Sequence, residues 1–145
     1  MKNKIVMYIG LLSMILFLHN CRAIQENSIK GTWKLSGNFV DENPNVAYSK
    51  STAQKIVSER IITFNSNETF DSNSDICNSE SDTLKFSNGK YYKYKNKDGY
   101  YIVQPNQCVG ISGSNILARI KNKQLYIEYP SIGYNYQIFD KIQKK

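Results

Sequence analysis

Three cysteines and a single histidine are the side chains with the most versatile chemistry in this 145-residue chain. Cys21 stands close to the N-terminus, whereas Cys77 and Cys108 lie well inside the chain. A cysteine can be acylated, oxidised to a disulfide, or used as a nucleophile, and nucleophilic use requires a nearby base such as histidine. The only histidine is His19, just before Cys21. The chemistry open to this chain therefore depends on the fate of its first segment.

Residues 1–20 have the organisation of a secretory signal peptide. Lys2 and Lys4 precede an apolar run over residues 5–18. This run is shorter than the about 20 residues that a membrane-spanning helix needs. It ends in Leu-His-Asn-Cys at residues 18–21, which resembles the lipidation signal of bacterial lipoproteins. The resemblance implies cleavage before Cys21, a lipid on that cysteine, and a membrane partner reached through the lipid.

Ordinary secretory cleavage is the alternative fate of this segment. Cys21-Arg22-Ala23 fits a small-x-small site, and cleavage after Ala23 would release a soluble secreted protein. We favour lipidation of Cys21 because it leaves Cys77 and Cys108 as an even pair in an oxidising compartment. We predict a disulfide between them, worth about 3.5 to 4 kcal/mol in the loop-entropy model. Two free buried thiols are the alternative.

Removal of residues 1–20 would leave a mature chain without histidine. Such a chain cannot build a Ser-His-Asp triad, a Cys-His pair or a histidine-based zinc site. Hydrolysis by carboxylates alone stays open, yet only Glu59, Glu128 and Asp140 fall within or beside predicted strands. We therefore predict no enzymatic activity, no catalytic residue, no metal and no cofactor.

From residue 30 onward the sequence predicts about eight short strands. Apolar and polar side chains alternate within them, which is typical of antiparallel strands around a core. Trp33, Leu35 and Phe39 share one face of the first strand, and Tyr134, Tyr136 and Ile138 share one face of the last. Residues 41–59 interrupt this pattern, and we expect a loop there with a short helix over residues 51–58. The predicted strands cover residues 30–39, 60–65, 69–71, 90–95, 99–104, 115–121, 124–129 and 133–142.

Gly31-Thr32-Trp33 at the start of the first strand resembles the Gly-x-Trp motif of lipocalins. Residues 61–70 resemble the second hairpin of the small lipocalin-like domains of bacterial lipoproteins, and residues 125–127 and 136–141 resemble their last two strands. The resemblance implies an all-β fold, a small antiparallel meander β-barrel. The domains would be a signal peptide at 1–20, a tether at 21–29 and the barrel at 30–145.

The resemblance also implies local roles. In lipocalins the glycine lets the chain turn into the barrel and the indole closes one end, beneath a stacked arginine. Lys141 is the nearest counterpart of that arginine here, and the C-terminal helix of larger lipocalins is missing. Both departures count against a roomy cavity.

An eight-stranded barrel holds packed side chains or at most one small ligand. We expect Trp33 and four tyrosines to fill the interior or to line a pocket for a small apolar or amphiphilic ligand. The four are Tyr92, Tyr94, Tyr134 and Tyr136. The expected function is therefore that of a non-catalytic, lipid-anchored binding module of the bacterial cell envelope, on the outer membrane at its periplasmic or surface face.

An interaction protein that uses its outer face is the alternative function. The formal charge is +7, and loss of Lys2 and Lys4 leaves +5, which favours an acidic protein or another polyanionic partner. Lysines interleave with tyrosines over residues 85–97, a composition that also suits nucleic acid. Nucleic acid is scarce outside the cytoplasm, so we predict no such partner.

Replacement of the proposed lipid attachment site tests the anchor. We expect Cys21→Ser to move the protein from the membrane fraction to the soluble fraction, because stable anchoring takes about two acyl chains. Immunoblotting of fractionated cells measures the change. Unchanged fractionation of the variant would exclude lipidation of Cys21.

Overall fold

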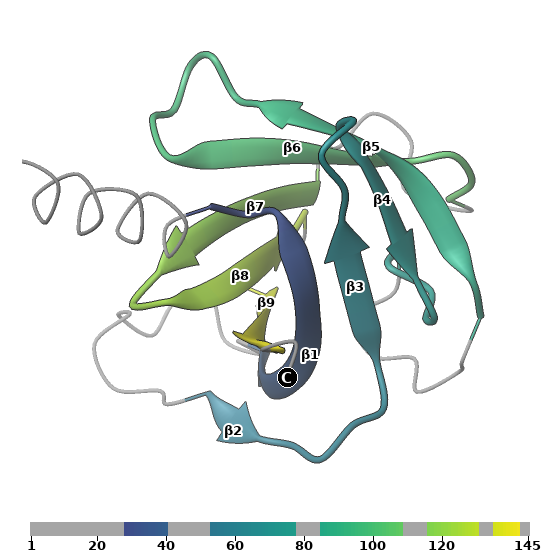
Figure 1. Cartoon of the computed structure of the whole chain (residues 1–145). Coiled ribbons are helices and arrows are strands. Elements are labelled where there is room, and N and C mark those ends of the chain that lie inside the picture. The colour runs from purple at the N-terminus through teal and green to yellow at the C-terminus, as the bar shows by residue number, and fades with distance from the viewer. Residues whose placement is uncertain (1–27, 41–52, 78–84, 109–115, 131–134, 143–145) are drawn as a thin grey trace, which may run out of the picture.

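The computed structural model describes residues 28–40, 53–77, 85–108, 116–130 and 135–142, which form an antiparallel β-barrel (Figure 1). Its strands are β1 (Gly31–Val40), β2 (Gln54–Lys55), β3 (Ile61–Phe64), β4 (Thr69–Ser72), β5 (Ser87–Lys93), β6 (Tyr100–Pro105), β7 (Ile116–Lys121), β8 (Gln124–Tyr129) and β9 (Asn135–Lys141). Eight strands pair in sequence order around the barrel, and pairing of β1 with β9 closes it. The predicted all-β meander barrel is confirmed. Among the described residues, no helix is long and apolar enough to cross a membrane.

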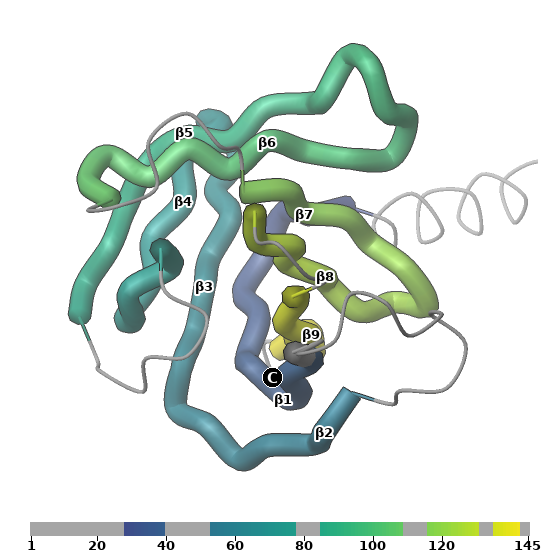
Figure 2. Tube along the Cα trace, turned by 180° about the vertical axis from the view of Figure 1, so that it is seen from behind, coloured from purple at the N-terminus to yellow at the C-terminus, as the bar shows by residue number. Residues whose placement is uncertain are grey.

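The two ends of the barrel differ in their connections (Figures 1 and 2). At one end, residues 65–68, 94–99 and 122–123 join β3 to β4, β5 to β6 and β7 to β8. Glu68, Asn122, Lys123 and Gly99 have positive φ angles there, as tight turns require. We call this the hairpin end. The connections after β1, β4, β6 and β8 leave from the opposite end, which we call the loop end.

Large apolar side chains fill the inside of the barrel. Phe64 and Phe70 face each other across β3 and β4, and Tyr91 meets Phe64 edge to face at 5.0 Å between ring centroids. Leu35, Leu125 and Phe139 pack at the closing seam, where β1 and β8 both pair with β9. One contiguous cluster results, formed by Ile29, Trp33, Leu35, Ile62, Phe64, Phe70, Ile76, Tyr91, Val103, Ile116, Ala118, Leu125, Ile127 and Phe139.

A β-bulge in β1 changes which side chains face inward. Leu35 pairs with Phe139, but Gly37 pairs with Ile138, so Ser36 is the extra residue between them. Before the bulge Trp33 and Leu35 face the core. After it, Phe39 faces outward with its partner on β9, so the prediction that all three share one face is wrong for Phe39.

Residues 53–58 do not form the helix that was expected over residues 51–58. Within them, Gln54 and Lys55 form the short strand β2, which pairs with β1 at Asn38 and Gly37. Residues 51 and 52 lie outside the described part of the chain. Beyond β2, Ile56 packs against the core and its backbone N–H donates to the carbonyl oxygen of Ser36, whereas the side chain of Val57 is fully exposed, so pairing with β1 stabilises this segment in place of a helix.

Candidate functional site

Trp33 lies at the hairpin end of the interior and is completely buried. Its indole Nε1 donates a hydrogen bond to the carbonyl oxygen of Ile29 at 2.8 Å. The Nζ atom of Lys141 lies 5.0 Å from the centroid of the Trp33 ring, within the range of a cation–π contact. Gly31 has φ +126°, and a Cβ atom there would lie 3.0 Å from Cε of Lys141. Trp33 therefore closes the hairpin end of the barrel, where it contacts the backbone and a lysine.

The predicted tyrosines do not gather around Trp33. Tyr92 faces outward on β5 and is 44% exposed, whereas its neighbour Tyr91 faces inward and donates a hydrogen bond to the carbonyl oxygen of Asn65. Tyr94 follows β5 in the hairpin, and Tyr134 lies outside the described residues. The prediction that Tyr92 belongs to the interior is therefore wrong.

Tyr136 is also placed on the other side of the sheet. On β9 the inward side chains are Gln137 and Phe139, which are 1% and 4% exposed, whereas Tyr136 and Ile138 face outward. Tyr136 stacks on Phe39 at 4.8 Å between ring centroids, with an interplanar angle of 12°. Of the four predicted ligand residues that the structure describes, Trp33 is the one that belongs to the core cluster.

A buried polar layer covers the apolar core at the loop end. Arg60, Ser72, Ser74 and Gln137 are all at most 4% exposed. Arg60 Nη2 donates to the carbonyl oxygen of Asp75 at 3.1 Å, and Ser72 and Ser74 share a hydrogen bond between their hydroxyls. These bonds offset the cost of burying polar groups. The two ends of the interior are therefore chemically distinct, since Trp33 lies at one end and Arg60 at the other.

Tyr129 belongs to the same polar layer. Its hydroxyl donates to Oε1 of Gln137 at 2.8 Å. Burial raises the pKa of Tyr129 above its ordinary value; the positive charge of Arg60 lowers it, and the negative charge of Asp75 raises it. The net direction is upward, so the folded protein retains this proton at high pH.

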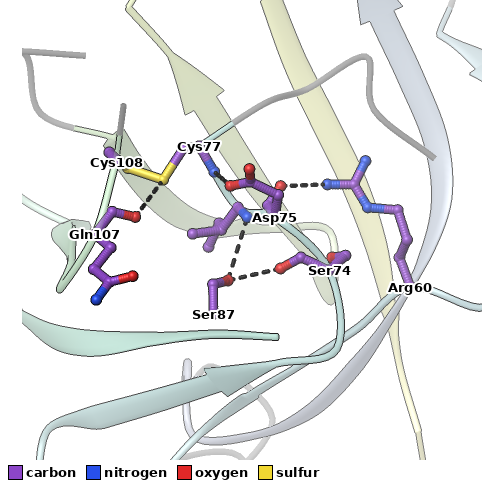
Figure 3. Close-up of a disulfide and its surroundings, with 8 residues drawn as sticks. Arg60, Ser74, Asp75, Cys77, Ser87, Gln107 and Cys108 are labelled. Atoms are coloured by element: carbon purple, nitrogen blue, oxygen red, sulfur yellow. Dashed lines mark hydrogen bonds between the residues drawn. A yellow bond between two sulfur atoms is a disulfide. The ribbon is translucent and has the colours of Figure 1, made fainter. Parts of the chain in front are cut away.

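Cys77 and Cys108 form the predicted disulfide at the loop end (Figure 3). Asp75 holds the first of them, because its Oδ1 accepts a hydrogen bond from the backbone N–H of Cys77 at 2.9 Å. Ser87 Oγ donates to the carbonyl oxygen of Ser74 at 2.6 Å and fixes the adjoining turn to β5. Arg60 and the disulfide thus anchor the same segment from two sides.

A groove of about 650 Å³ lies on the outer face of the barrel. Its floor is the outward face of β8 and β9, with Tyr126, Tyr136 and Ile138, and its far wall is the segment that carries β2. Gly37 lets β2 approach β1 closely at the groove, since a Cβ atom there would lie 3.3 Å from the carbonyl oxygen of Gln54. Gln124 and Asp140 border the groove and share a hydrogen bond. The result is an aromatic floor with a polar rim.

An aromatic row extends from this groove across the outer face. The ring centroids of Tyr136 and Tyr126 are 5.6 Å apart, and the guanidinium carbon of Arg119 lies 5.1 Å from the centroid of the Tyr126 ring. Arg119 also pairs with Glu128. These fixed aromatic and cationic side chains are of the types that dominate binding energy at protein interfaces. The tyrosines of β8 and β9 were the feature of the sequence that could have indicated this aromatic row. No feature of the sequence indicated the bulge in β1 that directs Phe39 onto Tyr136.

Within the described ranges, no three His, Cys, Asp or Glu side chains lie together as a metal site would require. Comparison with known protein families, curated proteins and solved structures found no match to this chain.

Titration of Tyr129 gives a test of the polar layer. An unfolded tyrosine ionises near pH 10, whereas the folded protein holds the Tyr129 proton to higher pH. Its contribution to stability is full below about pH 10 and is lost as the pH rises above that value. We expect the urea midpoint of Tyr129→Phe to fall less steeply than that of the wild type between about pH 9 and pH 11. An equal dependence of the urea midpoint on pH in the two proteins would contradict a raised pKa for the Tyr129 hydroxyl.

Proposed function

We propose that the protein is a non-catalytic binding module, held at the bacterial envelope by a lipid on Cys21, that binds a protein partner in its outer groove. The observation that carries this proposal is the contrast between the two faces of the sheet. The inner face is covered by a contiguous cluster that includes Trp33, Phe64 and Phe70. The outer face has a groove of about 650 Å³ with two tyrosines on its floor.

Rigid aromatic anchors favour a protein partner. Tyr136 is clamped between Phe39 and Tyr126, so it would lose little conformational freedom on binding. Gln124 and Asp140 at the rim offer hydrogen-bonding groups around the apolar floor. This combination of a buried aromatic centre and a polar border is the usual anatomy of a protein interface. The net charge of +5 that remains after loss of Lys2 and Lys4 would favour encounter with an acidic partner.

A small amphiphilic molecule is a second candidate for the same groove. The volume of about 650 Å³ lies within the range of about 300 to 1,000 Å³ that small-molecule sites occupy. Such a ligand would contact Tyr126 and Ile138 rather than Trp33.

Site-specific photocrosslinking in the producing cells distinguishes these candidates. A photoreactive amino acid at Gln124 in the groove should form a covalent adduct with a protein, and Tyr136→Ala should reduce that adduct about ten-fold or more, as for a binding hot spot. The same probe at Tyr92 is the matched control, because Tyr92 is an exposed tyrosine on the outer face of β5. We expect no adduct there.

Two results would contradict the protein-binding proposal. One is equal adducts at positions 124 and 92, which would indicate random encounters. The other is the absence of a protein adduct at position 124, together with a small molecule retained in native mass spectrometry. Loss of that small molecule in Tyr136→Ala would assign it to the groove, whereas its retention would place it elsewhere.

A further inference from the structure

We propose that the hairpin end of the barrel is a docking surface for anionic lipid headgroups. The first observation is where the N-terminus enters the fold. Ser28 precedes β1 at the hairpin end, and its carbonyl oxygen accepts a hydrogen bond from Nζ of Lys141. Both views show the start of β1 on the same side as the β5–β6 hairpin and the β7–β8 turn (Figures 1 and 2).

The short separation from Cys21 fixes this end near the membrane. Ser28 follows Cys21 by seven residues. An extended chain of that length spans about 25 Å. A lipid on Cys21 would therefore keep the hairpin end close to the bilayer and direct the loop end, with its disulfide, away from it. The inference rests on the tether of the proposed function but not on the outer groove.

Charge is the second observation. Exposed lysines at the hairpin end outnumber the acidic side chains there among the described residues. The lysines are Lys30, Lys90, Lys93, Lys95, Lys97, Lys121 and Lys123, and the acidic residues are Glu68, Asp71, Asp98 and Asp140. At the loop end, Glu59 pairs with Lys34, and Asp75 opposes the exposed lysines Lys55 and Lys85. The excess positive charge of the described barrel surface is therefore concentrated at the end that the tether holds against the membrane.

This distribution fits the electrostatics of an anionic bilayer. A lysine near such a surface strengthens binding by about five-fold, and the effect fades within about 10 Å at 0.1 M salt. Lys95 is carried by the β5–β6 hairpin and Lys121 by the end of β7, so two separate turns would contact headgroups together. Contact at two turns would fix the tilt of the barrel as well as its distance from the membrane.

Vesicle cosedimentation with Cys21→Ser protein that begins at residue 21 tests this surface without the lipid and without the apolar run over residues 5–18. The probes are vesicles of phosphatidylcholine alone and of phosphatidylcholine mixed with phosphatidylglycerol. We expect binding to the mixed vesicles only, and we expect it to weaken as salt rises. Lys95→Gln combined with Lys121→Gln should weaken binding about 25-fold, which is five-fold for each lysine.

The matched control is Lys55→Gln combined with Lys85→Gln, which removes the same charge from the loop end. We expect less than a three-fold effect, because these side chains face away from the bilayer. Equal losses in the two double variants would mean that only net charge matters, and absence of binding to the mixed vesicles would also overturn the proposal. Circular dichroism of both variants confirms that they fold. Failure of the tether itself would appear separately, as Cys21→Ser protein that stays in the membrane fraction of cells after a high-salt wash, which removes electrostatic binding.

Discussion

Closure of the sheet between β1 and β9 is the interaction on which the rest of the structure depends. The two strands pair along nearly their whole length, from Trp33 opposite Lys141 to Val40 opposite Asn135. This pairing fixes the circumference, and an eight-stranded barrel encloses a space that side chains can fill. It also brings the ammonium group of Lys141 onto the Trp33 ring. With the interior occupied by aromatic side chains, a binding function falls to the outer face.

The bulge at Ser36 lies in the strand pair that closes the barrel, and it also determines which side chains of β1 reach the outer face. It lets Trp33 and Leu35 pack inside while Phe39, on the same strand, packs outside against Tyr136. Without the extra residue Phe39 would face inward, because side chains alternate along a strand. The same irregularity places Gly37 at the floor of the groove beside Ile138. One inserted residue thus serves both the packed core and the open groove.

The sequence predicted the parts of this structure that depend on local rules. Alternation located the barrel strands, and the parity of the cysteines indicated the disulfide of Cys77 with Cys108. Alternation did not identify the inward face of β9, because large side chains occur on both of its faces. Tyr136 and Ile138 face outward, and Phe139 faces inward. The pattern predicts Gln137 on the outer face, whereas the structure buries it, with a hydrogen bond from the hydroxyl of Tyr129.

Trp33 is the only tryptophan and lies in the closed interior, so its fluorescence reports directly on the central claim that this barrel is filled. The measurement is quenching of Trp33 by a brominated fatty acid, titrated into the purified protein. The account predicts blue-shifted emission that the brominated chain does not quench, since Trp33 is 0% exposed and packs within a contiguous apolar cluster. Saturable quenching at one equivalent would show a ligand inside the barrel and would contradict the account.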